Sequence, residues 1–308
     1  MKGLVIKSTG SWYHVQLEDG TVLDCRIKGK FRTKGIKTTN PIAVGDQVSV
    51  EIDEESEART GIIYDLAERK NYIIRKSINL SKQTQIIASN IDQALLVVTL
   101  SKPRTSFGFI DRFLVTAEAY HIPVVLLFNK IDQYDDDDLA FLEEVIELYE
   151  KIGYPCRKIS ALKLIGIAEL KNQIAGQTSL LSGHSGVGKS TLINQIIPSA
   201  IIRTSTISAA SEKGIHTTTF AEMHPLETGG YIIDTPGIRE LGVVDIPNEE
   251  LAHYFPEMKK VMSRCKFHNC KHLNEPNCAV KEAYEKGIIA IPRYESYLSI
   301  MANEDNRR

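Results

Sequence analysis

The sequence has little of what marks secreted and membrane proteins. Its 308 residues include one tryptophan and five cysteines, an odd number. The longest apolar runs, such as 94–98 and 124–128, fall far short of the ~20 residues needed to cross a bilayer. No long apolar stretch follows the first six residues, as it would in a signal peptide. We therefore expect a cytoplasmic protein with no membrane partner and no disulfide framework.

An excess of charge of either sign is also missing. The 37 lysines and arginines nearly balance the 39 acidic residues, for a formal net charge of −2. Any nucleic-acid surface must therefore be a local patch. Hydrophobic residues at 43% and charged residues at 25% are ordinary for a folded globular protein, and the length predicts two or three domains.

Residues 1–66 contain five short β-type segments punctuated by glycine, which predicts a small barrel of the OB-fold type. A cationic stripe of period two lies in this region, with Phe31 in the same stretch and no acidic residue from 26 to 37. Its members are Arg26, Lys28, Lys30, Arg32 and Lys34. The stripe could be a solvated edge strand protected by lysines. We favour contact with RNA phosphates, with bases stacking on the aromatic ring.

The rest of the chain predicts two further domains. Residues 67–90 are polar and basic, which indicates a linker at the start of a domain spanning 67–245. Apolar strands and helical segments then alternate, a pattern typical of a mostly parallel sheet covered by helices on both faces. From 246 to 308 the chain is mainly helical and bears cysteines. The fold class is therefore a β-barrel, an α/β domain and a small α-helical domain.

A phosphate loop of the pattern G-x-x-x-x-G-K-[ST] follows a predicted strand and opens a predicted helix. It comprises Gly183, His184, Ser185, Gly186, Val187, Gly188, Lys189 and Ser190. The backbone N–H groups of such a loop surround phosphate oxygens. Lys189 is expected to reach the β and γ phosphates, and the Ser190 hydroxyl to bind Mg²⁺.

Two further segments fit the phosphate end of a nucleotide site. Asp234 ends an apolar strand and begins an Asp-x-x-Gly motif. Its carboxylate is expected to hold Mg²⁺ through water, with the N–H of Gly237 facing the γ-phosphate. The polar stretch 203–219 is expected to be a switch that supplies a threonine to Mg²⁺, most plausibly Thr218.

The base-binding residues indicate guanine. In the motif Asn129-Lys130-x-Asp132, the carboxylate of Asp132 can accept from the N1–H and the 2-amino group of guanine, whereas adenine offers neither donor on that edge. Lys130 can lie along the ring, and Asn129 can tie this loop to the phosphate loop. Ser160-Ala161 ends the next strand and could offer the Ala161 N–H to the guanine carbonyl. Asp132 thereby disfavours a P-loop kinase.

The order of these motifs is permuted. Asn-Lys-x-Asp and Ser-Ala precede the phosphate loop, which comes first in Ras-like GTPases, and Asp-x-x-Gly follows it. Joining the usual termini and cutting between Asp-x-x-Gly and Asn-Lys-x-Asp gives this order while leaving every strand in place. The sequence therefore predicts a circularly permuted GTPase domain.

A group of three cysteines and one histidine lies near the C-terminus: Cys265, Cys270, His272 and Cys278. Three thiolates and one imidazole suit one tetrahedral, structural Zn²⁺. His268 is a competing ligand, and three reduced structural cysteines are the alternative to a metal site. Cys25 and Cys156 fall in predicted strands and are expected to act as small hydrophobic residues.

These motifs and their order resemble the RsgA (YjeQ/YloQ) family of circularly permuted bacterial GTPases, as do Gly29-Lys30-Phe31-Arg32 and Val44-Gly45-Asp46. The resemblance spans almost the whole chain. It implies an OB domain, a permuted GTPase domain and a zinc domain. It also implies late maturation of the small (30S) ribosomal subunit, contact with 16S rRNA, binding of GTP and GDP, and hydrolysis stimulated by the subunit. We expect a monomer.

The residue that activates water is not given by a motif. Ile238 follows the Asp-x-x-Gly glycine, where Ras has a glutamine that orients the water. Slow intrinsic hydrolysis is therefore expected. His216, two residues before Thr218, is our candidate for the catalytic group, although it could merely pack or contact RNA. The competing function is an RNA-binding module with a GTP-sensing but catalytically weak site.

Overall fold

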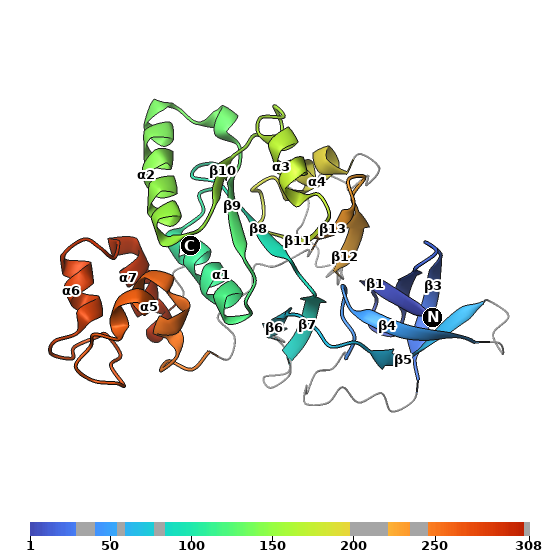
Figure 1. The fold of residues 1–308 in the computed structure, drawn as a ribbon. Helices are drawn as coiled ribbons and strands as arrows, with labels where there is room; N and C mark the ends of the chain where they lie inside the picture. The colour runs from blue at the N-terminus through green and yellow to red at the C-terminus, as the bar shows by residue number, and fades with distance from the viewer. Residues whose placement is uncertain (29–40, 54–58, 77–83, 198–220, 235–245, 305–308) are drawn as a thin grey trace, which may run out of the picture.

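The computed structural model describes the chain except for residues 29–40, 54–58, 77–83, 198–220, 235–245 and 305–308. Figure 1 shows a β-barrel (blue) on one side, an α/β body in the middle and a group of helices (orange to red) on the other side. Among the described residues, no helix has both the length and the apolar character needed to cross a membrane.

The N-terminal part is a closed five-stranded barrel, as predicted. Its strands are β1 (Lys2–Ser8), β2 (Tyr13–Leu17), β3 (Val22–Ile27), β4 (Gln47–Asp53) and β5 (Thr60–Leu66). They pair in the order β1-β2-β3-β5-β4, and β4 pairs again with β1 to close the barrel. Alternate side chains such as Val5, Val15 and Ile63 are fully buried inside it. The alternation arises because successive residues of a strand face opposite sides.

Residues 67–90 differ from the expected linker. They contain an antiparallel pair, β6 (Tyr72–Lys76) and β7 (Thr84–Ser89). Ile73 and Ala88 from this pair are buried against the core of the α/β body. The polar composition of the stretch as a whole hid these few apolar residues.

A buried polar cluster joins the barrel to β7 and the chain before it. The carboxylate of Asp46 accepts two hydrogen bonds from Arg69, at 2.6 and 2.7 Å, and one from the Ser89 hydroxyl. Gly45 has φ +93°, and a Cβ there would lie 2.2 Å from the Ser89 carbonyl oxygen. Only glycine fits this approach. The Val44-Gly45-Asp46 segment is therefore a joint between two parts of the chain.

The central body is an α/β sheet with helices on both faces. Its strands, in spatial order, are β10 (Cys156–Lys158), β9 (Val124–Phe128), β8 (Gln93–Val98), β11 (Gln177–Ser182), β13 (Gly230–Asp234) and β12 (Glu222–Pro225). All neighbouring pairs are parallel except β12 with β13. β12 also makes one bridging pair with β1, so the sheet continues into the barrel.

The two faces of this sheet carry separate apolar cores. Helices α1 (Phe107–Ala119) and α2 (Asp136–Ile152) cover Leu96 and Leu126 on one face. Helices α3 (Ile167–Ile174) and α4 (Lys189–Ile196) cover Leu95 and Leu127 on the other. Neighbouring strand residues thus supply opposite cores, which explains why these strands are almost continuously apolar.

The C-terminal part is helical and packs on α1. It contains the 3₁₀ turn η3 (Leu251–Tyr254) and helices α5 (Pro256–Met262), α6 (Ala279–Glu285) and α7 (Ile291–Met301). Val115 of α1 belongs to its apolar core, and Arg112 donates to the Ser299 hydroxyl at 3.3 Å.

A buried ion pair fixes α7 against α1. Arg293 and Asp111 are both fully buried, and Nη1 of Arg293 donates to the Asp111 carboxylate at 2.7 Å. The same guanidinium donates twice to Glu257 and lies over the ring of Phe255. The hydroxyl of Tyr149 donates to the same Asp111 oxygen at 2.9 Å. The ion pair therefore links α7, α5, α1 and α2.

Candidate nucleotide and metal sites

The predicted phosphate loop turns at the carboxyl end of β11 and leads into α4. Gly183, Gly186 and Gly188 all have positive φ, at +144°, +86° and +98°. A Cβ on Gly183 would lie 2.4 Å from the Val97 carbonyl oxygen, so the loop fits closely against β8 only because this residue has no side chain. Nζ of Lys189 donates to the carbonyls of Gly183 and His184, at 2.6 and 2.9 Å. The ammonium group is therefore held at the mouth of the loop.

Asn129 links three loops of the site. It is buried at the end of β9, where Nδ2 donates to the Val187 carbonyl of the phosphate loop at 2.8 Å. Its Oδ1 accepts from the Ala161 N–H at 3.0 Å. The loops after β9, β10 and β11 thus meet at one side chain. The expected tie to the phosphate loop is present, and the Ala161 N–H, expected to face guanine, donates to Asn129 in this structure.

Asp132 and Ser160 lie near Asn129, at the same carboxyl edge of the sheet. The Ser160 hydroxyl donates to Oδ1 of Asp132 and accepts from the Lys163 N–H. Lys130 adopts a left-handed conformation, with φ +64°, and its Nζ donates to the Lys102 carbonyl at 2.8 Å. Partial burial lowers the pKa of Lys130, and the nearby Asp132 opposes this shift. The structure therefore brings Asn129, Lys130, Asp132, Ser160 and Ala161 together.

Sequence reasoning missed two contributors to this edge. The Tyr134 hydroxyl donates to the Asn129 carbonyl at 3.1 Å and accepts from the Leu100 N–H at 2.7 Å. The loop 99–105 reaches the phosphate loop, since a Cβ on Gly186 would lie 3.3 Å from Cγ of Pro103. Neither belongs to a motif, and the contacts of Tyr134 with Leu100 and of Pro103 with Gly186 join residues distant in sequence.

The structure describes two of the three residues predicted to bind Mg²⁺. Ser190 is the second residue of α4, and Asp234 ends β13, the strand that pairs in parallel with β11. Both are half-buried at the same edge of the sheet. Thr218, Gly237 and His216 lie outside the described residues.

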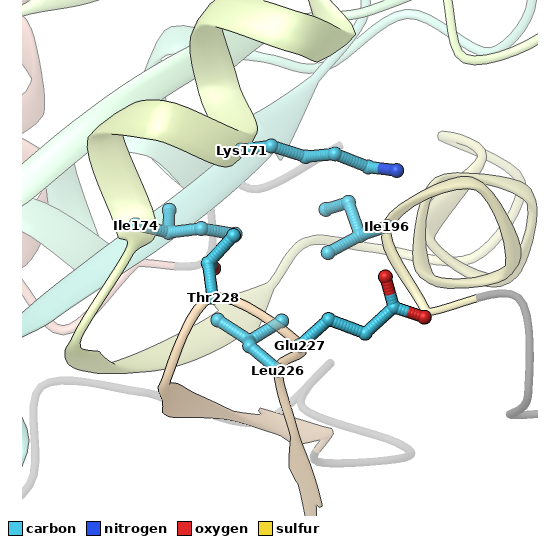
Figure 2. Close-up of a pocket in the computed structure, with 6 residues that line it drawn as sticks. All are labelled: Lys171, Ile174, Ile196, Leu226, Glu227 and Thr228. Atoms are coloured by element: carbon cyan, nitrogen blue, oxygen red, sulfur yellow. The ribbon is translucent and has the colours of Figure 1, made fainter.

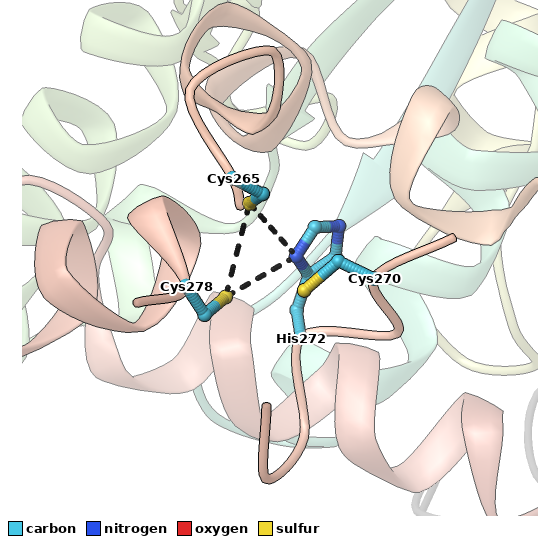
Figure 3. A group of neighbouring side chains, drawn as sticks. All are labelled: Cys265, Cys270, His272 and Cys278. Carbon is cyan, nitrogen blue, oxygen red and sulfur yellow. Dashed lines mark hydrogen bonds between the residues drawn. The ribbon is translucent and has the colours of Figure 1, made fainter. Parts of the chain in front are cut away.

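The three cysteines and His272 converge on one point, as Figure 3 shows. Their donor atoms all lie within 4.8 Å of one another, and the Sγ atoms of Cys265 and Cys278 are 4.0 Å apart. His272 Nδ1 lies 3.3 Å from Sγ of Cys278. Tetrahedral zinc with Zn–S bonds of about 2.3 Å would separate two sulfurs by roughly 3.8 Å. The donor set and its spacing therefore fit a metal ion.

The loop that carries these ligands is held by hydrogen bonds of its own. Tyr294 and Tyr297 of α7 donate to the carbonyls of His272 and Lys271, at 2.6 and 2.7 Å. Burial lowers the pKa of His272, which favours the neutral imidazole that binds metals. His268, the competing ligand, is exposed and lies outside the group. Burial raises the pKa of Cys25 to about 11 and that of Cys156 to about 12, in keeping with inert thiols.

Of the five residues in the cationic stripe, the structure describes the first two, Arg26 and Lys28. Lys28 is exposed and pairs with Glu51 at 2.7 Å, and the Arg26 guanidinium lies 4.6 Å from the ring centre of Trp12. Lys30, Arg32 and Lys34 lie outside the described residues.

A small pocket, shown in Figure 2, lies at the end of the central body opposite the predicted nucleotide site. It is formed where the ends of α3 and α4 meet the turn from β12 to β13, and its lining is Lys171, Ile174, Ile196, Leu226, Glu227 and Thr228. Ligands of open α/β sheets bind at the carboxyl ends of the strands. This pocket lies at the amino end of β13 and is not part of the nucleotide site.

Comparisons with known proteins agree with this geometry. The family model for the RsgA GTPase matches residues 66–244, and that for the RsgA N-terminal domain matches residues 2–63. A protein of Christiangramia forsetii named small ribosomal subunit biogenesis GTPase RsgA is 57% identical over 309 residues, covering 100% of this chain and 98% of its own. A Bacteroides fragilis protein of the same name is 54% identical over 305 residues, covering 99% and 97%.

Two solved structures share the whole fold. The crystal structure of YjeQ from Thermotoga maritima is 38% identical, with a TM-score of 0.79, and the match covers 100% of this chain and 99% of that one. The structure of YloQ, described as a circularly permuted GTPase, is 31% identical, with a TM-score of 0.74 and coverage of 100% and 96%. The order of motifs, the sheet topology and both sets of relatives agree, and the chain therefore belongs to the RsgA family of circularly permuted GTPases.

Proposed function

We propose that this chain binds GTP, hydrolyses it to GDP and phosphate, and acts in late maturation of the small (30S) ribosomal subunit. Membership of a GTPase family and relatives named for small ribosomal subunit biogenesis support this proposal. The subunit and its 16S rRNA are the proposed macromolecular partners of a cytoplasmic monomer. The boundaries 1–66, 67–245 and 246–308 are the proposed domain divisions.

The observation that best supports the proposed nucleotide site is the pair of hydrogen bonds made by Asn129. One buried amide holds the phosphate loop through Val187 and the loop after β10 through Ala161. A ligand that spans these loops would meet backbone N–H groups at one end and the Asp132 carboxylate at the other. A guanine nucleotide has phosphate and N–H donors at those two ends.

The roles at the phosphate end follow from the same arrangement. We assign Gly183, His184, Ser185, Gly186, Val187, Gly188, Lys189, Ser190 and Gly237 to phosphate binding. Mg²⁺ would bind Ser190, Thr218 and Asp234, and it would neutralise charge that develops on the phosphates.

Replacing Asp132 with asparagine is expected to weaken GTP binding by about 1 to 3 kcal/mol, because the variant loses one acceptor and turns an amide toward guanine donors. Xanthine has acceptors where guanine has its 2-amino group, so XTP should bind the variant better than GTP. Fluorescent-nucleotide titration measures both affinities.

A matched control lies three residues away. Asp135 caps α2 by accepting from the Asp138 N–H, and asparagine is an equally good cap. Asp135→Asn makes the same charge change and should keep the affinity for GTP. Wild-type affinity in the Asp132→Asn variant would contradict the assignment of Asp132 to the base.

Hydrolysis is proposed to depend on His216 and on the small subunit. Docking on the subunit would position His216 so that its imidazole orients the attacking water. His216→Ala should bind GTP and the subunit nearly as wild type but lose most of the stimulated phosphate release. His224→Ala, in β12, should keep stimulated turnover.

Two outcomes of this assay separate the alternatives. Full stimulated turnover in His216→Ala would assign water activation to a ribosomal group. GTP binding by the wild type without any phosphate release, with or without small subunits, would favour the RNA-binding module with a weak nucleotide site.

One structural Zn²⁺ is proposed for the C-terminal part, held by Cys265, Cys270, His272 and Cys278. Three thiolates and an imidazole are typical zinc ligands, and four protein ligands leave no open position for water. RNA contact is proposed for Lys28, Lys30, Arg32 and Lys34 of the barrel. The exposure of Lys28 supports this, since its pairing with Glu51 at the surface is weak and can be exchanged for phosphate.

A further inference from the structure

The side chain of His184, a residue of the phosphate loop, is held by contacts on two sides. Its Nδ1 lies 3.0 Å from the Ser185 carbonyl oxygen, and its Nε2 lies 2.7 Å from the hydroxyl oxygen of Thr105. The ring also meets Phe109 of α1 edge to face, with centroids 5.4 Å apart. The imidazole thus joins the phosphate loop to the start of α1.

The hydrogen-bond partners define the tautomer of this ring. A carbonyl oxygen only accepts, so Nδ1 must carry the proton that bonds Ser185. In the neutral imidazole Nε2 then accepts, and the Thr105 hydroxyl donates to it. The same hydroxyl oxygen accepts from the Thr99 N–H at 3.0 Å. The hydroxyl therefore makes one bond as donor and one as acceptor.

Thr105 is itself fixed in place. It is 5% exposed, and its N–H donates to the Thr99 carbonyl at 2.7 Å. The position of His184 matters for the phosphates because Nζ of Lys189 donates to the His184 carbonyl at 2.9 Å. A chain of contacts thus runs from buried Thr105, in the loop before α1, through His184, to the lysine expected to reach the phosphates.

We infer that Thr105 is a positioning residue for GTP binding: its hydroxyl anchors the His184 ring and so holds the phosphate loop in its binding conformation. The inference rests on the proposed function, because it assumes that this loop binds the phosphates of GTP. Thr105 acts through His184 and needs no contact with the nucleotide. Pre-ordering a loop lowers the entropy lost on binding, so losing the anchor should weaken binding.

The test compares three variants by stopped-flow titration with a fluorescent GTP analogue. Thr105→Val keeps the shape and removes the hydroxyl, and we expect a three- to tenfold loss of affinity, in the range of one hydrogen bond. Thr105→Ser restores the hydroxyl and should bind within about twofold of wild type. Thr116→Val removes a buried hydroxyl within α1, which bonds the Arg112 carbonyl, and should also stay within about twofold.

A spectroscopic readout tests the contact without nucleotide. The side-chain ¹⁵N shifts of His184, assigned by comparison with His184→Gln, should report a proton on Nδ1 and an acceptor at Nε2. The Nε2 shift should move in Thr105→Val and return in Thr105→Ser.

The outcomes separate this inference from the proposed function. Wild-type affinity in Thr105→Val, an equal loss in Thr116→Val, or an unchanged Nε2 shift would overturn the role of Thr105. A wild-type protein that binds no GTP would overturn the proposed function, even if the Nε2 shift still moved in Thr105→Val.

Discussion

Replacing Arg293 with alanine is expected to destabilise the packing of α7 on α1 by about 3 to 5 kcal/mol. Removing one partner of a buried ion pair leaves the other as an uncompensated buried charge. Asp111 is fully buried, and its remaining partners, such as the Tyr149 hydroxyl, are neutral. Amide hydrogen exchange of α7 measures the effect, and protection there should fall by at least about a hundredfold.

The loss of stability in Arg293→Ala should depend on pH in a defined direction. Burial raises the pKa of Asp111, and Arg293 opposes this shift. Without Arg293, the carboxyl group of Asp111 keeps its proton in the folded state at pH values above about 4, the ordinary carboxyl pKa. In the unfolded state the same group is ionised at these pH values. The variant should therefore lose stability as pH rises, and its deficit should shrink toward pH 4.

A double variant provides the control for this interpretation. In Arg293→Met with Asp111→Asn, the buried charge of Asp111 is gone and part of the protection should return. Wild-type exchange of α7 in Arg293→Ala would contradict the claim that this ion pair fastens the C-terminal helices.

Removing one ligand of the metal group is the second large effect that we expect. Cys278→Ser should release the metal and unfold the segment around 262–280, because binding of a structural metal is coupled to folding of its ligand loop. Cys278 also caps α6 by accepting from the Lys281 N–H, and serine keeps that cap. The substitution therefore isolates the contribution of the metal. Elemental analysis and hydrogen exchange measure the two parts of the prediction.

Cys156→Ala is the matched control, since it removes a buried cysteine outside the metal group. It should keep the metal content of the wild type, and GTP binding should survive in Cys278→Ser. Wild-type protein that is purified in reduced form without zinc, or Cys278→Ser that retains it, would contradict the assignment.

Local patterns predicted much of this molecule. The strands of the barrel and of the central sheet follow from alternation or continuous apolarity, which depend on residues close in sequence. The phosphate loop was predictable because its glycines meet a backbone requirement, seen in the 2.4 Å approach at Gly183. The three cysteines and one histidine lie within a short stretch, so their chemistry was also visible in the sequence.

What the sequence did not reveal depends on contacts between distant residues. The β6–β7 pair lies in a stretch with too few apolar residues to give a clear pattern. Thr105 and His184 are 79 residues apart, and Arg293 and Asp111 are 182 apart. A single sequence read on its own carries no signal for such pairs. His272 and His268 could be separated only once the loop was folded, because both have spacings compatible with a metal.

The separation of Arg293 from Asp111 also has a consequence for how the protein is made. Chains grow by about 5 to 20 residues per second, so the 182 residues between the two partners correspond to roughly 9 to 36 s of translation. During that interval the residues of α1 have been synthesised, while Arg293, whose guanidinium pairs with the Asp111 carboxylate, has not. The face of α1 that includes Val115 is then also without its apolar cover. This face of α1 is therefore accessible to water and to chaperones until α7 has been synthesised.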